Sequence, residues 1–193
     1  MTAKPKIGLV QGSIREGRFN DVIARWASRG LASHGFEIER IDPRDPELLP
    51  VQIGDKEAVE TLKRRLRALD GFVILTPEYN HAAPGHLKTL IDAASGEWEA
   101  KPVGFISYGG LSGGLRAVES LRIVFAELHS VTLRDTVSFS MPWDRFDASG
   151  TLLDQDDAIR SGEALAVFAD RLAWWLDTLS AAAQRTPYRE NAA

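Results

Sequence analysis

The chain has 193 residues, a net charge of -4 and 44% hydrophobic residues. This length is typical of one domain that buries about 70% of its unfolded surface. No apolar run approaches the roughly 18 residues of a membrane span, and no leader pattern opens the chain, so we expect a soluble, cytoplasmic protein. The absence of cysteine excludes disulfides, thiolate nucleophiles and cysteine-ligated clusters. Without a basic block, nucleic acid is not an expected partner.

Short apolar runs alternate with longer segments of helical periodicity. The expected strands are 6–11, 36–41, 71–75, 102–107 and 136–139, and the expected helices are 21–34, 56–69, 86–94, 115–128 and 159–183. Two of these strands, 71–75 and 102–107, are apolar throughout, as are strands buried on both faces. In contrast, 36–41 alternates polar and apolar residues and is expected at an edge.

Five strands alternating with five helices predict a doubly wound α/β fold with a parallel sheet, because parallel neighbours need a crossover connection. We expect one domain over 1–193, with a loose tail from about residue 185. Trp174 and Trp175 of the last helix point about 100° apart, so one is expected to face the sheet and the other a partner.

Three loops carry the residues expected to bind a ligand. In doubly wound folds ligands lie beyond the carboxyl ends of the strands. The loops 12–20, 76–85 and 108–114 follow the first, third and fourth expected strands and are rich in glycine and small polar residues. Their common position predicts a single site.

The first loop, GSIREGRFN, departs from two phosphate-binding patterns. Arg18 and Phe19 replace the lysine and hydroxyl of the nucleoside-triphosphate motif, and the second glycine of the dinucleotide motif is absent. A terminal monophosphate at a helix N-terminus fits better. Its expected donors are Ser13, Arg15, Arg18 and Asn20. The alternative is a turn with an Asn20 or Asp21 cap and two solvated arginines.

The third loop contains GLSGG, which matches the nucleophile elbow of serine hydrolases at Ser112. The only histidine that follows is His129, at the far end of an expected helix and so about 20 Å away. That separation is too long for proton transfer. The glycines are better interpreted as backbone that approaches a flat ligand, and the alternative is a flexible turn.

Other polar groups predict no chemistry of their own. The four histidines are scattered and give no metal-ligand spacing, so no metal site is expected. Asp154, Asp156 and Asp157 are expected to form a solvated helix start.

Three segments together resemble the NADPH-dependent FMN reductase family of flavodoxin-like proteins, which includes quinone, azo-dye and chromate reductases. They are GSIREGRFN, TPEYNHAAPGHLKTLIDAAS and SYGGLSGGLRA, in matching order and spacing. The resemblance implies the sheet order 2-1-3-4-5 and the cofactors FMN and NADPH.

The resemblance also implies a role for each segment. Ser13, Arg15 and Asn20 would hold the FMN phosphate, while Arg18, where many relatives have serine, would clamp the phosphate or reach NADPH. The second segment would line the isoalloxazine edge and the third would lie beside the ring. The residues concerned are Pro77, Glu78, Tyr79 and Asn80 in the second, and Ser107, Gly109 and Gly110 in the third.

By the same resemblance, NADPH would reduce the flavin and leave, and a quinone-like acceptor would then take the electrons, with no catalytic side-chain acid or base. A homodimer or homotetramer is expected, with Tyr79 stacking on a bound partner molecule or wedged in a subunit interface. Arg18 and Arg116 are candidates for the 2′-phosphate of NADPH. The alternatives are a flavodoxin-like electron carrier without nicotinamide activity and a non-enzymatic scaffold or sensor.

Overall fold

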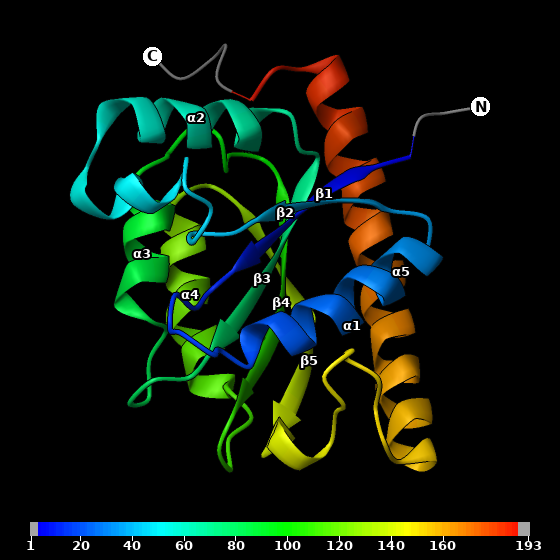
Figure 1. Ribbon diagram of the computed structural model, residues 1–193. Helices are drawn as coiled ribbons and strands as arrows, with labels where there is room; N and C mark the ends of the chain where they lie inside the picture. Colours follow the sequence, from blue (N-terminus) through cyan, green and yellow to red (C-terminus); the bar gives the residue numbers. More distant parts are fainter. Residues whose placement is uncertain (1–3, 189–193) are drawn as a thin grey trace.

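The computed structural model describes residues 4–188, which form a parallel sheet of order β2-β1-β3-β4-β5 covered by helices (Figure 1). The strands are β1 (Lys6–Gln11), β2 (Glu37–Ile41), β3 (Gly71–Pro77), β4 (Pro102–Gly109) and β5 (Val131–Ser140). The helices are α1 (Asn20–Ser33), α2 (Lys56–Arg67), α3 (Gly85–Asp92), α4 (Leu115–Glu127) and α5 (Gln155–Arg185), with short 3-10 turns at Leu49–Ile53 and Pro142–Asp144. The predicted fold class and strand order are confirmed.

The sheet separates two apolar cores. Helices α1 and α5 pack on one face and α2, α3 and α4 on the other (Figure 1). Along β3, Val73 and Leu75 join the first core, whereas Phe72 and Ile74 join the second. This alternation between two buried faces explains why the strand is apolar throughout.

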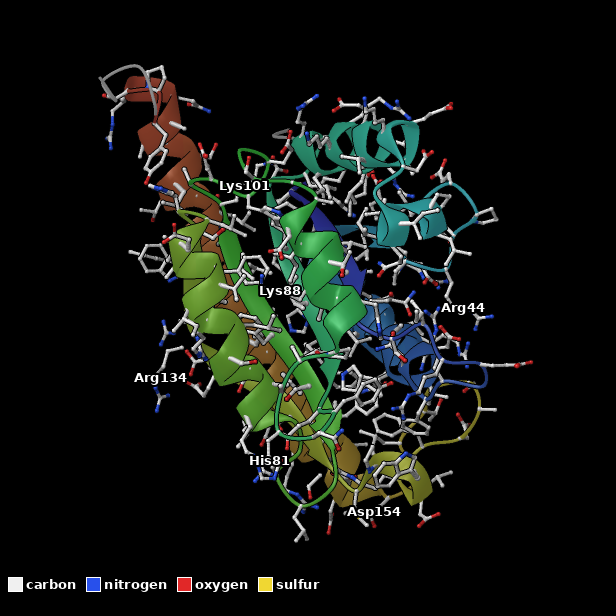
Figure 2. All side chains as sticks on the ribbon, turned by 90° about the vertical axis from the view of Figure 1, so that its left-hand side faces the viewer. Arg44, His81, Lys88, Lys101, Arg134 and Asp154 are labelled. Atoms are coloured by element: carbon white, nitrogen blue, oxygen red, sulfur yellow. The ribbon has the colours of Figure 1, made fainter. Side chains whose placement is uncertain are left out.

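The carboxyl ends of three strands lie side by side. Gln11 pairs with Leu75, and Pro77 pairs with Tyr108. The Gly12 amide donates to the Leu75 carbonyl oxygen at 2.7 Å, so the ladder continues into the first loop. Figure 2 shows His81 near this end of the molecule and Lys101 at the opposite end. The three loops therefore leave the sheet at one edge, as predicted.

Two elements extend beyond their expected bounds. Strand β5 begins at Val131 and not at residue 136, because this edge strand has the half-exposed polar residues that apolar-run counting misses. Helix α5 begins at Gln155, where the Asp154 side chain accepts a hydrogen bond from the Asp157 amide at 2.8 Å. It continues to Arg185, so the expected tail begins later, and residues 189–193 lie outside the described residues.

The expectation of a solvated Asp157 is wrong. Its carboxylate is 12% exposed and accepts two hydrogen bonds from Arg145, at 2.8 and 2.7 Å. Trp174 is 58% exposed and Trp175 packs against the α1–α5 core, so the predicted difference between the two rings is confirmed. The partner of Trp174 and the single-domain organisation remain predictions.

Candidate functional site

The first loop, residues 12–20, ends in a helix without a side-chain cap. Phe19 is the N-cap residue of α1 and provides no capping oxygen, so the Asn20 or Asp21 cap of the alternative interpretation does not form. Within the described chain, the amides of Ile14 and Gly17 also have no hydrogen-bond acceptor. An uncapped helix start with free amides favours an anion.

The second loop forms a tight hairpin. Tyr79 and Ala82 exchange backbone hydrogen bonds of 2.9 and 3.1 Å, and the two residues between them, Asn80 and His81, have φ of 50° and 68°. Two successive residues with positive φ are typical of a type I′ turn. The turn directs Tyr79 back over the first loop.

Tyr79 joins the first two loops. Its hydroxyl forms a 2.9 Å hydrogen bond with the Ser13 hydroxyl, and the Arg15 guanidinium carbon lies 3.8 Å from the centre of its ring. Such a cation–π contact is favourable. One face of the Tyr79 ring is therefore already covered by Arg15.

The third loop is held by hydroxyls and by Glu78. Ser107 and Ser138 both donate to the Gly113 carbonyl oxygen, at 2.9 and 2.7 Å. The Glu78 carboxylate accepts from the Ser112 hydroxyl at 2.9 Å and from Arg116 Nε at 2.8 Å. Burial alone would raise the pKa of Glu78, but these partners, Arg116 first, lower it below its ordinary value. The carboxylate links the second loop to the third as an anion.

These loops surround a pocket of about 410 Å³, a size usual for small-molecule sites. Its lining residues are Ser13, Arg15, Glu16, Gly17, Arg18, Phe19, Pro77, Glu78, Tyr79, Tyr108, Gly109, Gly110 and Trp143. Of the eleven predicted site residues, Asn20, Asn80 and Ser107 are absent from this lining. Asn20 and Ser107 are buried, and Asn80 is exposed in the hairpin turn.

Two further hollows are present, of which the first shares only Arg18 with the pocket of the three loops and the second shares no residue with it. One, of about 470 Å³, lies between α1 and Arg40. The other, of about 690 Å³, is lined by Lys101, where burial lowers the pKa to about 8, and lies at the opposite end of the strands. Volume alone does not make a site, and neither hollow gathers residues from several carboxyl ends.

Comparison with known proteins identifies the family. The model of a family described as NADPH-dependent FMN reductase matches residues 5–144. The chain belongs to this family.

A 2-hydroxy-1,4-benzoquinone reductase of Burkholderia sp is 31% identical over 188 residues, which cover 89% of this chain and 96% of that protein. An NAD(P)H-dependent FMN reductase of Schizosaccharomyces pombe is 34% identical over 121 residues, 57% of this chain and 60% of that one. In fold, the chain is similar to FerB, a flavoenzyme NAD(P)H:(acceptor) oxidoreductase of Paracoccus denitrificans. That structure has a TM-score of 0.72 and 21% identity, and the match covers 90% of this chain and 98% of that one.

As a member of this family, the protein is an oxidoreductase that uses FMN and NAD(P)H. The pocket residues fit FMN. Arg15 forms no ion pair within residues 4–188, so its charge is available beside the free amides of the first loop. The opposite side of the pocket consists of backbone and aromatic rings, which suit a flat ring.

The reductase has no hydrolase arrangement at Ser112. The Ser112 hydroxyl donates to Glu78, and its other hydrogen bond is from the Gly114 amide at 3.4 Å. His129 follows the far end of α4 and its Nδ1 contacts Tyr188 instead. No histidine activates Ser112 in the part of the chain that the structure describes.

Tyr108, Phe19 and Trp143 line the pocket of the reductase but were not predicted. Tyr108 lies in a strand and Phe19 in a loop, and packing alone accounts for an aromatic residue at either position. Burial raises the pKa of Tyr108 above its ordinary value. Trp143 lies in the turn after β5 and is 50% exposed. The one sequence signal for Trp143 was a tryptophan just after the end of an expected strand.

Within the described residues, no group of acidic or histidine side chains could hold a metal ion. No helix among residues 4–188 is long and apolar enough to cross a membrane.

Proposed function

We propose that this reductase passes electrons from NADPH, through FMN bound in the pocket of the three loops, to a quinone-type acceptor. The observation that carries the proposal is the pocket itself, which has an uncapped helix start and Arg15 at one side and backbone with aromatic rings at the other. When bound, FMN would supply the hydride chemistry: a hydride from NADPH would reduce it, NADP⁺ would leave, and the two electrons would then pass to the acceptor.

The phosphate of FMN belongs at the first loop in this proposal. Ser13 and Arg15 supply side-chain donors there, and Ile14 and Gly17 supply free amides. Tyr79 keeps Arg15 in place through a cation–π contact, in which the guanidinium carbon lies 3.8 Å from the ring centre. The Ser13 hydroxyl is fixed by the same tyrosine.

The isoalloxazine ring belongs beside Pro77–Tyr79 and Gly109–Gly110. The Glu78 and Tyr79 amides donate to Tyr108 and Ala82 and are unavailable to a ligand. The amides of Asn80 and Gly110 have no acceptor among the described residues. These are two backbone donors that could stabilise negative charge on a reduced ring.

The acceptor position is proposed at the open side of the pocket, beside Trp143. A half-exposed indole offers a flat apolar surface against which a quinone ring stacks well. Quinone-type acceptors are supported by the Burkholderia relative, whose name states a benzoquinone substrate. We further propose a cytoplasmic homodimer or homotetramer.

Anaerobic spectroscopy tests the proposal. Protein purified with FMN should be yellow, should bleach on addition of NADPH and should regain colour on addition of a benzoquinone. A protein that binds FMN but is not bleached by NADPH or NADH is an electron carrier. Failure to retain FMN at all would contradict the proposed function.

A further inference from the structure

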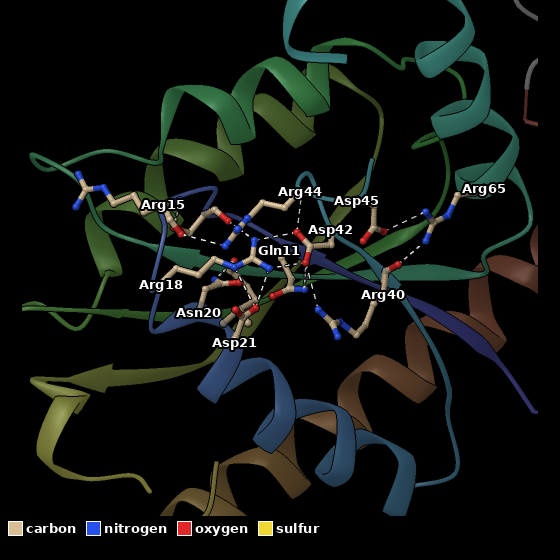
Figure 3. Close-up of polar contacts among 12 residues, drawn as sticks. Gln11, Arg15, Arg18, Asn20, Asp21, Arg40, Asp42, Arg44, Asp45 and Arg65 are labelled. Atoms are coloured by element: carbon tan, nitrogen blue, oxygen red, sulfur yellow. Dashed lines mark hydrogen bonds and ion pairs between the residues drawn. The ribbon is translucent and has the colours of Figure 1, made fainter. Parts of the chain in front are cut away.

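Arg18 occupies a buried position between the first loop and the end of β2. Its side chain is 4% exposed and that of Asp42 is 7% exposed. The two form a bidentate ion pair, with Arg18 Nη1 donating to Asp42 Oδ1 at 2.8 Å and Nη2 donating to Oδ2. Figure 3 shows this pair at the centre of a group of polar side chains.

All three nitrogens of the Arg18 guanidinium already have partners within the protein. An arginine carries five N–H groups, one on Nε and two on each terminal nitrogen. Nε donates to Asp21 at 3.0 Å. Nη1 donates to Asp42 and to the Ser13 carbonyl oxygen. Nη2 donates to Asp42 and forms an ion pair with Asp21. Two carboxylates also offset its single charge.

Asp42 connects the first loop to two strands. It accepts hydrogen bonds from Gln11 Nε2 at 3.0 Å, at the end of β1, and from the Arg44 amide at 2.9 Å, just after β2. Arg40 of β2 adds a contact at 3.2 Å. Burial alone would raise the pKa of Asp42, but the hydrogen bond from Arg18 and its other partners lower it, so the carboxylate is charged at neutral pH.

This network fixes the direction of the first peptide units of the loop. The Ser13 carbonyl oxygen accepts from Arg18, and the Gly12 carbonyl oxygen accepts from His86 Nε2 at 3.0 Å. A trans peptide directs its C=O and its N–H to opposite sides. The Ile14 amide is therefore turned away from Arg18, and it has no acceptor within the described chain.

We propose that Arg18 is a positioning residue: paired with Asp42, it holds the first loop in the shape that binds the FMN phosphate, without contacting the phosphate itself. This inference rests on the proposed function. It differs from a role as direct phosphate ligand, because four of the five N–H groups of Arg18 already donate to oxygens of the protein.

Asp42→Asn separates the two roles by the sign of its effect. If Arg18 contacted the phosphate, removing a neighbouring negative charge would leave FMN affinity unchanged or increase it. If Arg18 acts through Asp42, the loop loses its anchor and FMN affinity falls. Riboflavin, which lacks the phosphate, measures the contribution of the rest of the pocket.

The experiment compares dissociation constants for FMN and riboflavin, measured by flavin fluorescence quenching, together with melting temperatures. We expect Asp42→Asn to reduce the preference for FMN over riboflavin by about tenfold or more, the effect of weakening hydrogen bonds to a charged group. Arg18→Lys retains the charge without the bidentate geometry, so it should reduce the preference in the same way. An unchanged or increased preference in both variants overturns the proposal.

Glu97→Gln is the matched control. Glu97 is also 7% exposed and is also paired with an arginine, Arg67, at 2.7 Å, but it lies before β4, at the opposite end of the sheet. It should lower the melting temperature like Asp42→Asn and leave the FMN preference intact. A similar loss of preference in Glu97→Gln would mean that general destabilisation is responsible, which overturns the positioning role.

The wild-type protein distinguishes this inference from the proposed function. If the wild type binds riboflavin as tightly as FMN, no phosphate subsite exists at the first loop and the proposed cofactor position fails. The wild type could prefer FMN, and Asp42→Asn and Arg18→Lys could show the same preference. In that case the cofactor position survives and only the role of Arg18 fails. If Asp42→Asn does not fold, Asp42→Glu, which displaces the carboxylate from Arg18, takes its place, and an unchanged preference in Arg18→Lys still overturns the proposal.

Discussion

The first and third loops border the same pocket but are held in place by different means. Polar side chains hold the first loop: the charged Arg18 and the neutral His86 donate to its carbonyl oxygens. Close backbone packing holds the third loop in addition to its hydroxyls and Glu78: a Cβ on Gly114 would lie 2.9 Å from Tyr108 N and 2.8 Å from Ser107 Cβ. A Cβ on Gly17 in the first loop would meet nothing within 4 Å.

This difference corresponds to what each loop is proposed to bind. A phosphate needs donors at set positions, which charge pairs can hold while the loop itself stays open to the ligand. A flat ring needs a smooth wall, and glycine backbone provides one. Substitutions should therefore affect the third loop through shape and the first loop through charge.

The largest expected effect is that of Gly114→Ala. Gly114 has φ of 89°, and the added methyl group would contact both the Tyr108 and the Ser107 atoms. Strain and overpacking together should lower the free energy of unfolding by about 3 kcal/mol or more. Urea denaturation measures this. A loss below about 1 kcal/mol would show that the third loop can move away from β4.

Arg15→Ala should weaken FMN binding by about tenfold to a hundredfold, since a hydrogen bond to a charged group contributes about 1.5–3 kcal/mol. Riboflavin binding should change little. Flavin titration of the variant and of Arg44→Ala, a nearby arginine outside the pocket lining, measures the difference. Equal retention of FMN by wild type and Arg15→Ala would place the phosphate elsewhere.

A smaller effect is expected for Gly17→Ala. Gly17 also has a positive φ, 61°, but its surroundings are open. The cost should be only the conformational strain of about 1 kcal/mol. When both variants are measured by urea denaturation, the difference between their losses of unfolding free energy gives the contribution of packing, separate from backbone strain. Equal losses for the two variants would remove the contrast between the loops.

The smallest expected effect depends on pH and concerns His86. Burial, followed by the charges of Arg15 and Arg18, lowers the pKa of His86 below its ordinary 6.5, although the Gly12 carbonyl opposes this. The unfolded chain therefore takes up the proton first as the pH falls. The contribution of neutral His86 is complete above pH 6.5 and is lost as the pH falls through the lower folded pKa.

His86→Gln keeps a donor for the Gly12 carbonyl and cannot titrate. Its melting temperature relative to wild type should thus rise when the pH is lowered from about 7.5 to about 5. Asp42 and Glu78 have pKa values lowered from 3.8 and 4.5, so they lose their charge below this range. A temperature difference that is constant over this range would show that His86 does not change protonation there.

Much of the site could be predicted because it lies in contiguous segments. The segments 12–20, 76–85 and 108–114 were identified by composition. They supply every position that lines the pocket except Trp143, although Pro77, Tyr108 and Gly109 belong to the ends of β3 and β4. Trp143 belongs to a fourth connection, after β5, which carried no glycine-rich signal. Asp157 was misinterpreted because its partner, Arg145, is twelve residues away on a different turn.

The sequence by itself determined the sheet, its central strands and the edge at which the three loops meet, because these follow from the local periodicity of apolar residues and from the rule for parallel crossovers. Only the tertiary structure decided what Arg18 does. Its partner Asp42 is 24 positions away and reaches it because β1 and β2 end side by side. Residue spacing along a chain does not encode which charges meet in space, and that choice separates a phosphate ligand from a residue that shapes the loop.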